Sequence, residues 1–458
     1  MNTQSRCWGN TLEYIRTSSF IFCLSFKPSE PHLTQYLVSV KGLTEQQVND
    51  DVYPCFTYSS FVILLLVAGS KCIQFGLCSG LVRCSWQLSD QLLILFGCTG
   101  RVITRFLLLF GTGLRQMQLM QVTFSFGTIT EVVFYAYILK VVPAEESQSL
   151  TAVAQAAFLA AHVVSGFLGD VLLSGVGLSG LMWISALFVC MAACIACTFR
   201  HVDHSEAMQP CNCRPLLAIR AVYSARVFWM TALWWTLNYS VYSIVFSYEP
   251  SLYAEYLGKD GPDLNGSISA VALLVGAAAA LVLSCRCVEL AVSKAPLLTF
   301  AGLSEVMAAM TAFMGWGPRS KLGVASAFTG FFAAWSFGNV LFYGETRRVV
   351  DSFAETFVQD AEEYDRRLQR QASHPMVLQL ISLLCILNST VGTCFSGFLT
   401  AVLFTWQDLD IASALKGMSL AQAAVGGAMV LFAMLQAVRS PVTSLQRVPP
   451  CNDGVQSQ

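Results

Sequence analysis

Long apolar runs, separated by short polar segments, alternate along almost the whole chain. A helix needs about 20 mostly apolar residues to cross the hydrocarbon core of a bilayer, and charged residues, Gly and Pro mark where such runs end. The predicted spans cover residues 9–27, 53–70, 90–112, 117–141, 150–173, 177–198, 227–248, 267–289, 295–315, 321–343, 375–403 and 418–438. The pattern therefore predicts an all-α membrane protein with twelve transmembrane helices.

A polar stretch divides these spans into two sets of six. Paired halves around a site near the bilayer midplane are the architecture of carriers of the major facilitator type. The expected organisation is an N-terminal half at 1–198, a cytoplasmic central loop at 199–226, a C-terminal half at 227–440 with a charged cytoplasmic helical extension at 344–372, and a cytoplasmic tail at 441–458. The number of spans alone does not establish transport, because channels, scramblases and membrane enzymes also use many helices.

The distribution of positive charge predicts the orientation in the membrane. Most of the 27 Lys and Arg residues fall in the segments that share a side with the N-terminus, and short loops rich in positive residues stay cytoplasmic. Both termini are therefore expected in the cytoplasm. Asn265-Gly266-Ser267 then forms a glycosylation sequon in an outside loop, which makes Asn265 a candidate for modification.

Composition narrows the function. Hydrophobic residues make up 55% of the chain and charged residues 12%, and the net charge of −1 gives no reason to expect a nucleic-acid partner. Most of the 17 cysteines fall inside apolar runs and are interpreted as buried free thiols. The spacing of His201, His204, Cys211 and Cys213 matches no standard zinc pattern. No spacing supports a catalytic set, so we expect neither an enzyme nor a metal or cofactor.

Ionisable residues inside the predicted spans are few, and each costs at least about 2.5 kcal/mol near the bilayer centre unless it faces a cavity or a partner. Glu131 lies midway along the fourth span, beside Phe134 and Tyr135. A carboxylate among aromatic rings suits an organic cation or a heteroaromatic hydrogen-bond donor. The alternative is a structural ion pair with Arg101 or Arg105, which lie four residues apart on the third span.

A second carboxylate accompanies a break in the first helix. Glu30 lies in Lys27-Pro28-Ser29-Glu30-Pro31, where two prolines interrupt the helix and leave backbone groups unpaired. Interrupted helices mark binding sites in transporters, although a local cap or an ion pair with Lys27 is the alternative. Aromatic residues near the second and seventh spans, with Phe56 and Trp235 among them, are candidates for either packing or substrate contact.

Three stretches resemble the vitamin carriers of the reduced folate carrier and thiamine transporter family. They are Lys27-Pro28-Ser29-Glu30-Pro31 with Tyr36-Leu37, the segment from Leu43-Thr44 to Thr57-Tyr58-Ser59, and the segment from Leu107-Leu108-Leu109-Phe110-Gly111 to Tyr135-Ala136-Tyr137-Ile138. The resemblance covers residues 26–142 well and is thin afterwards. It implies the major facilitator fold, a plasma-membrane location and transport of a water-soluble vitamin.

The resemblance also implies a substrate. Glu131 occupies a position that is Glu in the thiamine-like members and Arg in the folate-like members, and Phe56 and Phe134 fall where thiamine carriers stack the substrate rings. Ser243 and Ser269 replace the Asn and the acidic residue expected of thiamine carriers in the seventh and eighth spans.

The prediction is a thiamine carrier. Folate or a pyridoxine-like vitamin is the alternative substrate, and a non-transporting membrane receptor is the alternative class. The expected partners are the vitamin and the lipid bilayer, and a coupled proton or anion stays open.

Overall fold

The structure is a computed structural model that describes residues 3–30, 32–44, 47–74, 89–200, 219–220, 222–223, 225–257, 265–316, 321–359, 365–400, 402–403 and 411–439. Helices make up nearly all of this part of the chain. In the N-terminal half they are α1 (Thr3–Ser25), α2 (Leu33–Ser39), the short π-helix η1 (Gln47–Val52), α3 (Tyr53–Gln74), α4 (Asp90–Phe110), α5 (Leu114–Val141) and α6 (Ala144–Cys197). The C-terminal half contributes α8 (Arg226–Leu257), α9 (Asn265–Val282), α10 (Arg286–Ser293), α11 (Pro296–Trp316), α12 (Lys321–Gln359), α13 (Asp365–Thr400) and α14 (Ile411–Arg439).

The predicted membrane spans coincide with these helices. Among the described residues, eight helices are long and apolar enough to cross a membrane, or nine if the bent pair α9 and α10 counts as one span. The predicted spans at 9–27, 53–70 and 227–248 coincide with α1, α3 and α8, which are helical without being among the eight. The helix set confirms an all-helical membrane architecture and is consistent with twelve spans, but it does not fix that number.

The predicted span 267–289 is wrong at its end. Helix α9 ends at Val282, and α10 leaves it at an angle of 80°. Arg286 and Glu289 supply the physical reason, because their charges favour a short surface helix over a continued apolar span, and α10 has no buried residue. Glu289 pairs there with Arg348 of α12, at 3.2 Å between Oε1 and Nη2.

A glycine divides α6 close to the predicted boundary between the fifth and sixth spans. Gly177 has φ 68° and ψ 176°, a backbone conformation that a helix interior does not adopt and that L side chains rarely reach. Two helices therefore meet at this position, as the predicted spans 150–173 and 177–198 require.

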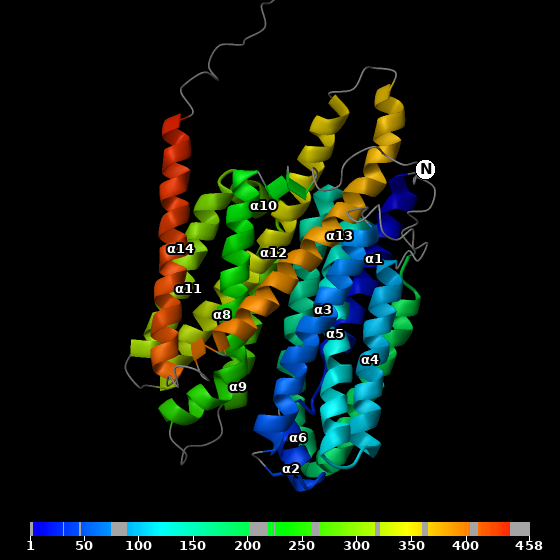
Figure 1. The fold of residues 1–458 in the computed structure, drawn as a ribbon, viewed down its shortest axis with the longest axis vertical. Coiled ribbons are helices and arrows are strands. Elements are labelled where there is room, and N and C mark those ends of the chain that lie inside the picture. The colour runs from blue at the N-terminus through cyan, green and yellow to red at the C-terminus, as the bar shows by residue number, and fades with distance from the viewer. Residues whose placement is uncertain are drawn as a thin grey trace, which may run out of the picture.

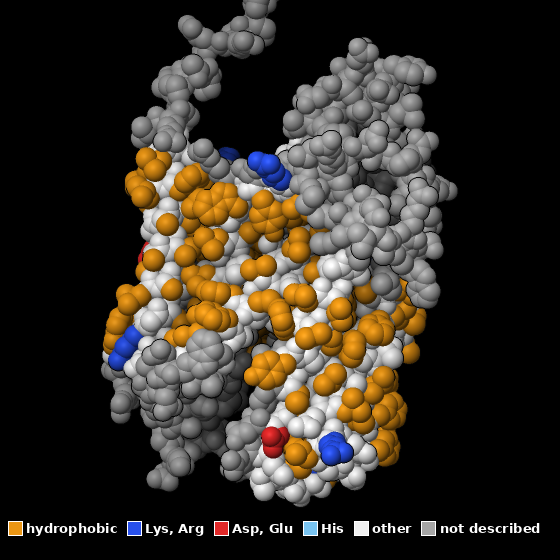
Figure 2. All heavy atoms as spheres, in the orientation of Figure 1, with side chains coloured by type: hydrophobic (Ala, Val, Ile, Leu, Met, Phe, Trp, Pro, Cys, Tyr) orange, Lys and Arg blue, Asp and Glu red, His pale blue; other side chains and the backbone are white. Residues whose placement is uncertain are grey.

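The two halves lie side by side, with the N-terminal half in blue and cyan and the C-terminal half in green to red (Figure 1). The halves meet where α6 contacts α9 and α12, and where α13 crosses to contact α3 and α5. Each half has its own apolar core. Large apolar side chains also cover the visible outer face (Figure 2), as expected of a surface that faces lipid.

The predicted charged extension at 344–372 falls on the last part of α12 and the first part of α13. In Figure 1 these two segments project together from one end of the bundle. Arg347 pairs with Asp351 there, at 2.7 Å between Nε and Oδ2.

Candidate functional site

A tight turn replaces the first helix at its two prolines. Helix α1 ends at Ser25, and the turn is held by backbone bonds such as Glu30 N–H to Lys27 O at 3.0 Å. Two serines of α6 anchor it from outside, because Lys27 N–H donates to Ser165 Oγ at 2.7 Å and Ser29 N–H to Ser185 Oγ at 3.2 Å. The hydroxyl groups of these two serines thus pair with backbone N–H groups that the interrupted helix leaves without partners.

The turn also packs directly on the backbone of α6. A Cβ atom added at Gly169 would lie 2.7 Å from the carbonyl oxygen of Pro28. Only a residue without a side chain lets the turn approach α6 this closely. The position of Lys27 and Glu30 therefore depends on a glycine far away in the sequence.

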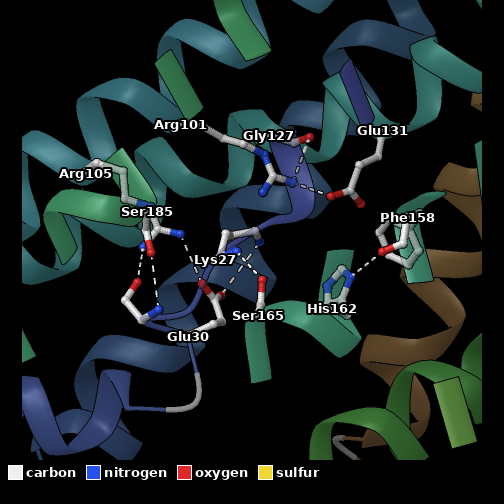
Figure 3. A network of polar contacts seen from close by, with 11 residues as sticks. Lys27, Glu30, Arg101, Arg105, Gly127, Glu131, Phe158, His162, Ser165 and Ser185 are labelled. Carbon is white, nitrogen blue, oxygen red and sulfur yellow. Dashed lines mark hydrogen bonds and ion pairs between the residues drawn. The ribbon is translucent and has the colours of Figure 1, made fainter. Parts of the chain in front are cut away.

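Two arginines of α4 hold the two predicted carboxylates (Figure 3). Arg105 Nη2 lies 3.1 Å from Glu30 Oε2, and Arg101 makes an ion pair with Glu131 of α5. Lys27 lies between these pairs, with its Nζ 4.0 Å from Glu30 Oε1. The structural ion pairs expected as alternatives from the sequence are thus present, and Glu131 is not an isolated carboxylate.

The members of each ion pair differ in exposure. The side chains of Arg101 and Arg105 are 5% and 4% exposed, whereas those of Glu30 and Glu131 are each 40% exposed. Each guanidinium is therefore packed into the protein while its carboxylate keeps free surface. A ligand can reach the acidic side of both pairs.

Arg101 uses only part of its hydrogen-bonding capacity. Its Nη2 also donates to Gly127 O at 3.4 Å, and Gly127 makes room for the guanidinium, because a Cβ there would overlap it. The Nε and Nη1 atoms of Arg101 are buried and have no hydrogen-bond partner in the described chain.

Aromatic rings border the charged cluster on one side. The ring of Phe124 lies 5.2 Å from Lys27 Nζ and 5.1 Å from Arg101 Cζ, which are cation–π distances. Phe56 packs on the same ring, with 5.3 Å between centroids. Phe56 thus lies beside the cluster, as a stacking residue would need to. Phe134 has no exposed surface and packs on Phe20 in the core of the N-terminal half.

The sequence reasoning missed His162 of α6, which Figure 3 shows beside the cluster, next to Phe158. Its Nδ1 lies 2.9 Å from the carbonyl oxygen of Phe158. The ring also contacts Phe158 and, at 6.3 Å between centroids, Phe246 of α8. A single His in an apolar run was the available signal.

A hydrogen-bonded chain joins the site to the C-terminal half. Tyr135 donates to Gln155 Oε1 at 2.6 Å, and Asn339 Nδ2 donates to the same oxygen at 3.3 Å. Trp235 Nε1 then donates to Asn339 Oδ1 at 2.9 Å. Tyr135 also stacks on Tyr343 of α12, with 4.8 Å between centroids. The structure thus brings Tyr135 and Trp235 together through two polar residues that the sequence reasoning did not identify.

The remaining predicted site residues lie in the C-terminal half. Ser243 is half-buried in α8 and Ser269 is half-buried in α9. Asn265 is the first residue of α9. Their roles in binding or modification stay predictions.

A second charged cluster lies at another level of the bundle and was also missed. Asp90, at the start of α4, binds Lys71 with 3.0 Å between Oδ1 and Nζ, and it pairs with Lys140 at the end of α5. Ser382 of α13 donates to Asp90 Oδ2 at 3.1 Å and accepts from Lys140. This cluster, which we call the interhalf lock, therefore joins three helices of the N-terminal half to the C-terminal half.

Further contacts between the halves lie near the interhalf lock. Arg347 of α12 donates to Leu139 O of α5, and Arg348 donates to Gln148 Oε1 of α6 at 2.5 Å. Within the described ranges, no group of three or more His, Cys, Asp or Glu residues could hold a metal ion. The histidines and cysteines at 201–213 lie outside those ranges.

Comparison with known proteins confirms the resemblance found in the sequence. Residues 12–215 match the family model of the reduced folate carrier. Thiamine transporter 1 of Mus musculus is 26% identical over 336 residues, which are 60% of this chain and 64% of that protein. Thiamine transporter 2 of Macaca fascicularis is 34% identical over 161 residues, and folate transporter 1 of Caenorhabditis elegans is 32% identical over 165 residues. These two matches cover 35% of this chain and 30% and 33% of the two relatives. The chain thus spans less than two thirds of the length of these relatives.

Solved structures confirm the fold. The human organic anion transporter MFSD10 matches 93% of this chain and 98% of its own, with a TM-score of 0.59 at 12% identity. The proton:xylose symporter XylE of the major facilitator superfamily matches 94% of this chain and 97% of its own, with a TM-score of 0.59 at 12% identity. The nucleoside transporter NupG matches 91% of this chain and 99% of its own, with a TM-score of 0.54 at 16% identity. The chain is thus a multi-pass membrane protein with the major facilitator fold.

Proposed function

We propose that this protein is a carrier for a water-soluble vitamin, that thiamine is its substrate, and that it works by alternating access. The observation that carries the proposal is the pair of accessible carboxylates, Glu30 and Glu131, held by buried arginines inside a major facilitator bundle. A carboxylate with 40% of its surface free can exchange its partner for a ligand, whereas a fully buried pair cannot. The thiamine transporters among the relatives support the choice of vitamin.

In this proposal the charged groups and the aromatic groups bind different parts of the substrate. Glu131 and Glu30 bind the positive charge of the substrate, and Phe56 stacks on a substrate ring with Phe124 behind it. Tyr135 lies one helical turn from Glu131, and its hydrogen bond and ring contact connect the occupied site to α12. Phe134 packs in the core in this conformation and contributes indirectly, by supporting α5.

Alternating access requires each end of the bundle to open in turn. The interhalf lock, Arg347 and Arg348 join the halves at the end where α5 stops and α6 begins. If that end is cytoplasmic, as the charge distribution predicts, this conformation is closed toward the cytoplasm. Substrate would then enter from outside and reach Glu30 and Glu131 first.

One observation favours a second substrate. The cluster holds three cations, Lys27, Arg101 and Arg105, against two carboxylates. This excess suits an anionic vitamin, and folate transporter 1 is among the relatives. Folate is therefore the alternative substrate.

Competition separates the two substrates. Cells that express the protein are given labelled thiamine, and unlabelled thiamine or unlabelled folate is added in excess. The proposal predicts that thiamine removes the uptake and folate does not; the reverse pattern with labelled folate would replace thiamine by folate. Counterflow in proteoliposomes distinguishes a carrier from a receptor. A carrier exchanges preloaded unlabelled substrate for labelled substrate, which accumulates inside, whereas a receptor that does not transport gives no accumulation.

Location and topology are part of the same proposal. The protein is placed in the plasma membrane with both termini in the cytoplasm and with Asn265 glycosylated. Removal of N-glycans should increase the electrophoretic mobility of the wild-type protein and leave Asn265→Gln unchanged. Tags at either terminus should be reached by antibody only after the cells are permeabilised, and staining of intact cells would reverse the orientation.

A further inference from the structure

The hydrogen-bonding state of His162 follows from its single protein contact. Nδ1 lies 2.9 Å from the carbonyl oxygen of Phe158, which can only accept, so Nδ1 carries the hydrogen. In the neutral ring Nε2 then has a free lone pair and is an acceptor. Among the described residues, Nδ1 to Phe158 O is the hydrogen bond that the His162 ring makes, and Figure 3 shows the ring turned toward the charged cluster.

The other polar groups around this space carry charge. Lys27, Arg101 and Arg105 are donors only, and Glu30 and Glu131 are charged acceptors paired with them. His162 is therefore a neutral acceptor within a set of charges. It is also flanked by aromatic rings, with centroids 4.5 Å away for Phe158 and 6.3 Å for Phe246.

We propose that His162 is a specificity residue that accepts a hydrogen bond from an amino group on the heteroaromatic ring of the substrate. The inference rests on the proposed function, since it identifies the feature that the site selects in a vitamin such as thiamine. The ring would lie between Phe56 and His162, with its positive charge at Glu131 and its amino group at Nε2. A ring that carries a carbonyl oxygen in place of the amino group would place that oxygen against His162 Nε2, and two acceptors cannot form a hydrogen bond.

Thiamine and oxythiamine, in which the ring amino group is replaced by oxygen, provide the test. Each is used to compete with labelled thiamine in cells that express the wild type, His162→Gln, His162→Phe or the control Val164→Ala, whose side chain is exposed on α6. The wild type should prefer thiamine by about tenfold, the factor expected for one hydrogen bond. His162→Gln should keep the preference through its amide oxygen, and His162→Phe should lose it. Val164→Ala should match the wild type.

A measurement on the wild type needs no variant to fold: equal inhibition constants for thiamine and oxythiamine would overturn the role of His162 and leave the carrier intact. A preference for thiamine that survives in His162→Phe would do the same. Absence of thiamine uptake by the wild type overturns the proposed function and this inference with it.

Discussion

The two charged clusters of this protein contain similar residues in opposite settings. In the interhalf lock, Lys71, Asp90 and Lys140 have side chains that are 9%, 6% and 1% exposed. In the charged cluster around Lys27 the carboxylates of Glu30 and Glu131 are 40% exposed, although their arginines are buried. The comparison teaches that the exposure of the carboxylate, rather than the presence of an ion pair, separates a group that can exchange partners from one that cannot.

The largest effect is expected from Asp90→Asn. This substitution leaves Lys71 and Lys140 buried without a carboxylate, and breaking a buried pair in this way costs about 3–5 kcal/mol. The melting temperature of the purified protein in detergent should fall strongly. Glu131→Gln is the matched carboxylate-to-amide control, and an equal fall in both would remove the distinction between the clusters.

Glu131→Gln should instead affect transport. Loss of a charged hydrogen bond of about 2–3 kcal/mol predicts a fall of roughly 30- to 150-fold in kcat/KM for thiamine. The melting temperature should fall less than in Asp90→Asn, because the carboxylate is accessible to water and the Gln amide oxygen can still accept from Arg101. Uptake is measured with surface expression held equal, and wild-type uptake in this variant would show that Glu131 does not bind substrate.

Asn339→Leu tests the connection between the site and the C-terminal half. The variant removes the hydrogen bonds with Trp235 and Gln155, each of which contributes about 1 kcal/mol. The maximal rate of uptake should fall by roughly tenfold while the KM for thiamine stays close to that of the wild type. A rise in KM with an unchanged maximal rate would place Asn339 in substrate binding instead.

Ser382→Ala should give the smallest effect and concerns the lock alone. The hydroxyl group bridges Asp90 and Lys140 across the two halves, and its loss costs about 0.5–1.5 kcal/mol. Opening at this end should therefore become two- to tenfold more frequent. Cys385, buried one turn away on α13, reports the opening through its rate of maleimide labelling, quantified at that peptide by mass spectrometry. An unchanged rate would show that Ser382 does not hold the halves together.

The sequence predicted the break in the first helix and the fold because both depend on local pattern. Prolines interrupt helices wherever they occur, and apolar runs of span length need no knowledge of neighbours. The interhalf lock was missed for the opposite reason. Asp90 lies at a span end, where a charge ordinarily meets water, and only the packing of α3, α5 and α13 buries it.

The site was predicted in part. Glu131 and Tyr135 are four residues apart and face the same way, whereas Phe134 is turned toward the core of the N-terminal half. Sequence position alone places all three together, so the resemblance that implied stacking by Phe134 could not show that its ring is covered. His162 and Gln155 give no local signal, because their importance comes from what α4, α5 and α12 bring beside them.

The close contact of Gly169 with the carbonyl of Pro28 has a consequence for reading natural variation. A change from Gly to Ala is usually scored as conservative, above all in the middle of an apolar helix. At this position the added methyl group would push the turn that holds Lys27 and Glu30. An individual with the variant would therefore express a protein with an altered affinity for its substrate. Genetic screening that weighs only distance in sequence from the binding residues would overlook it.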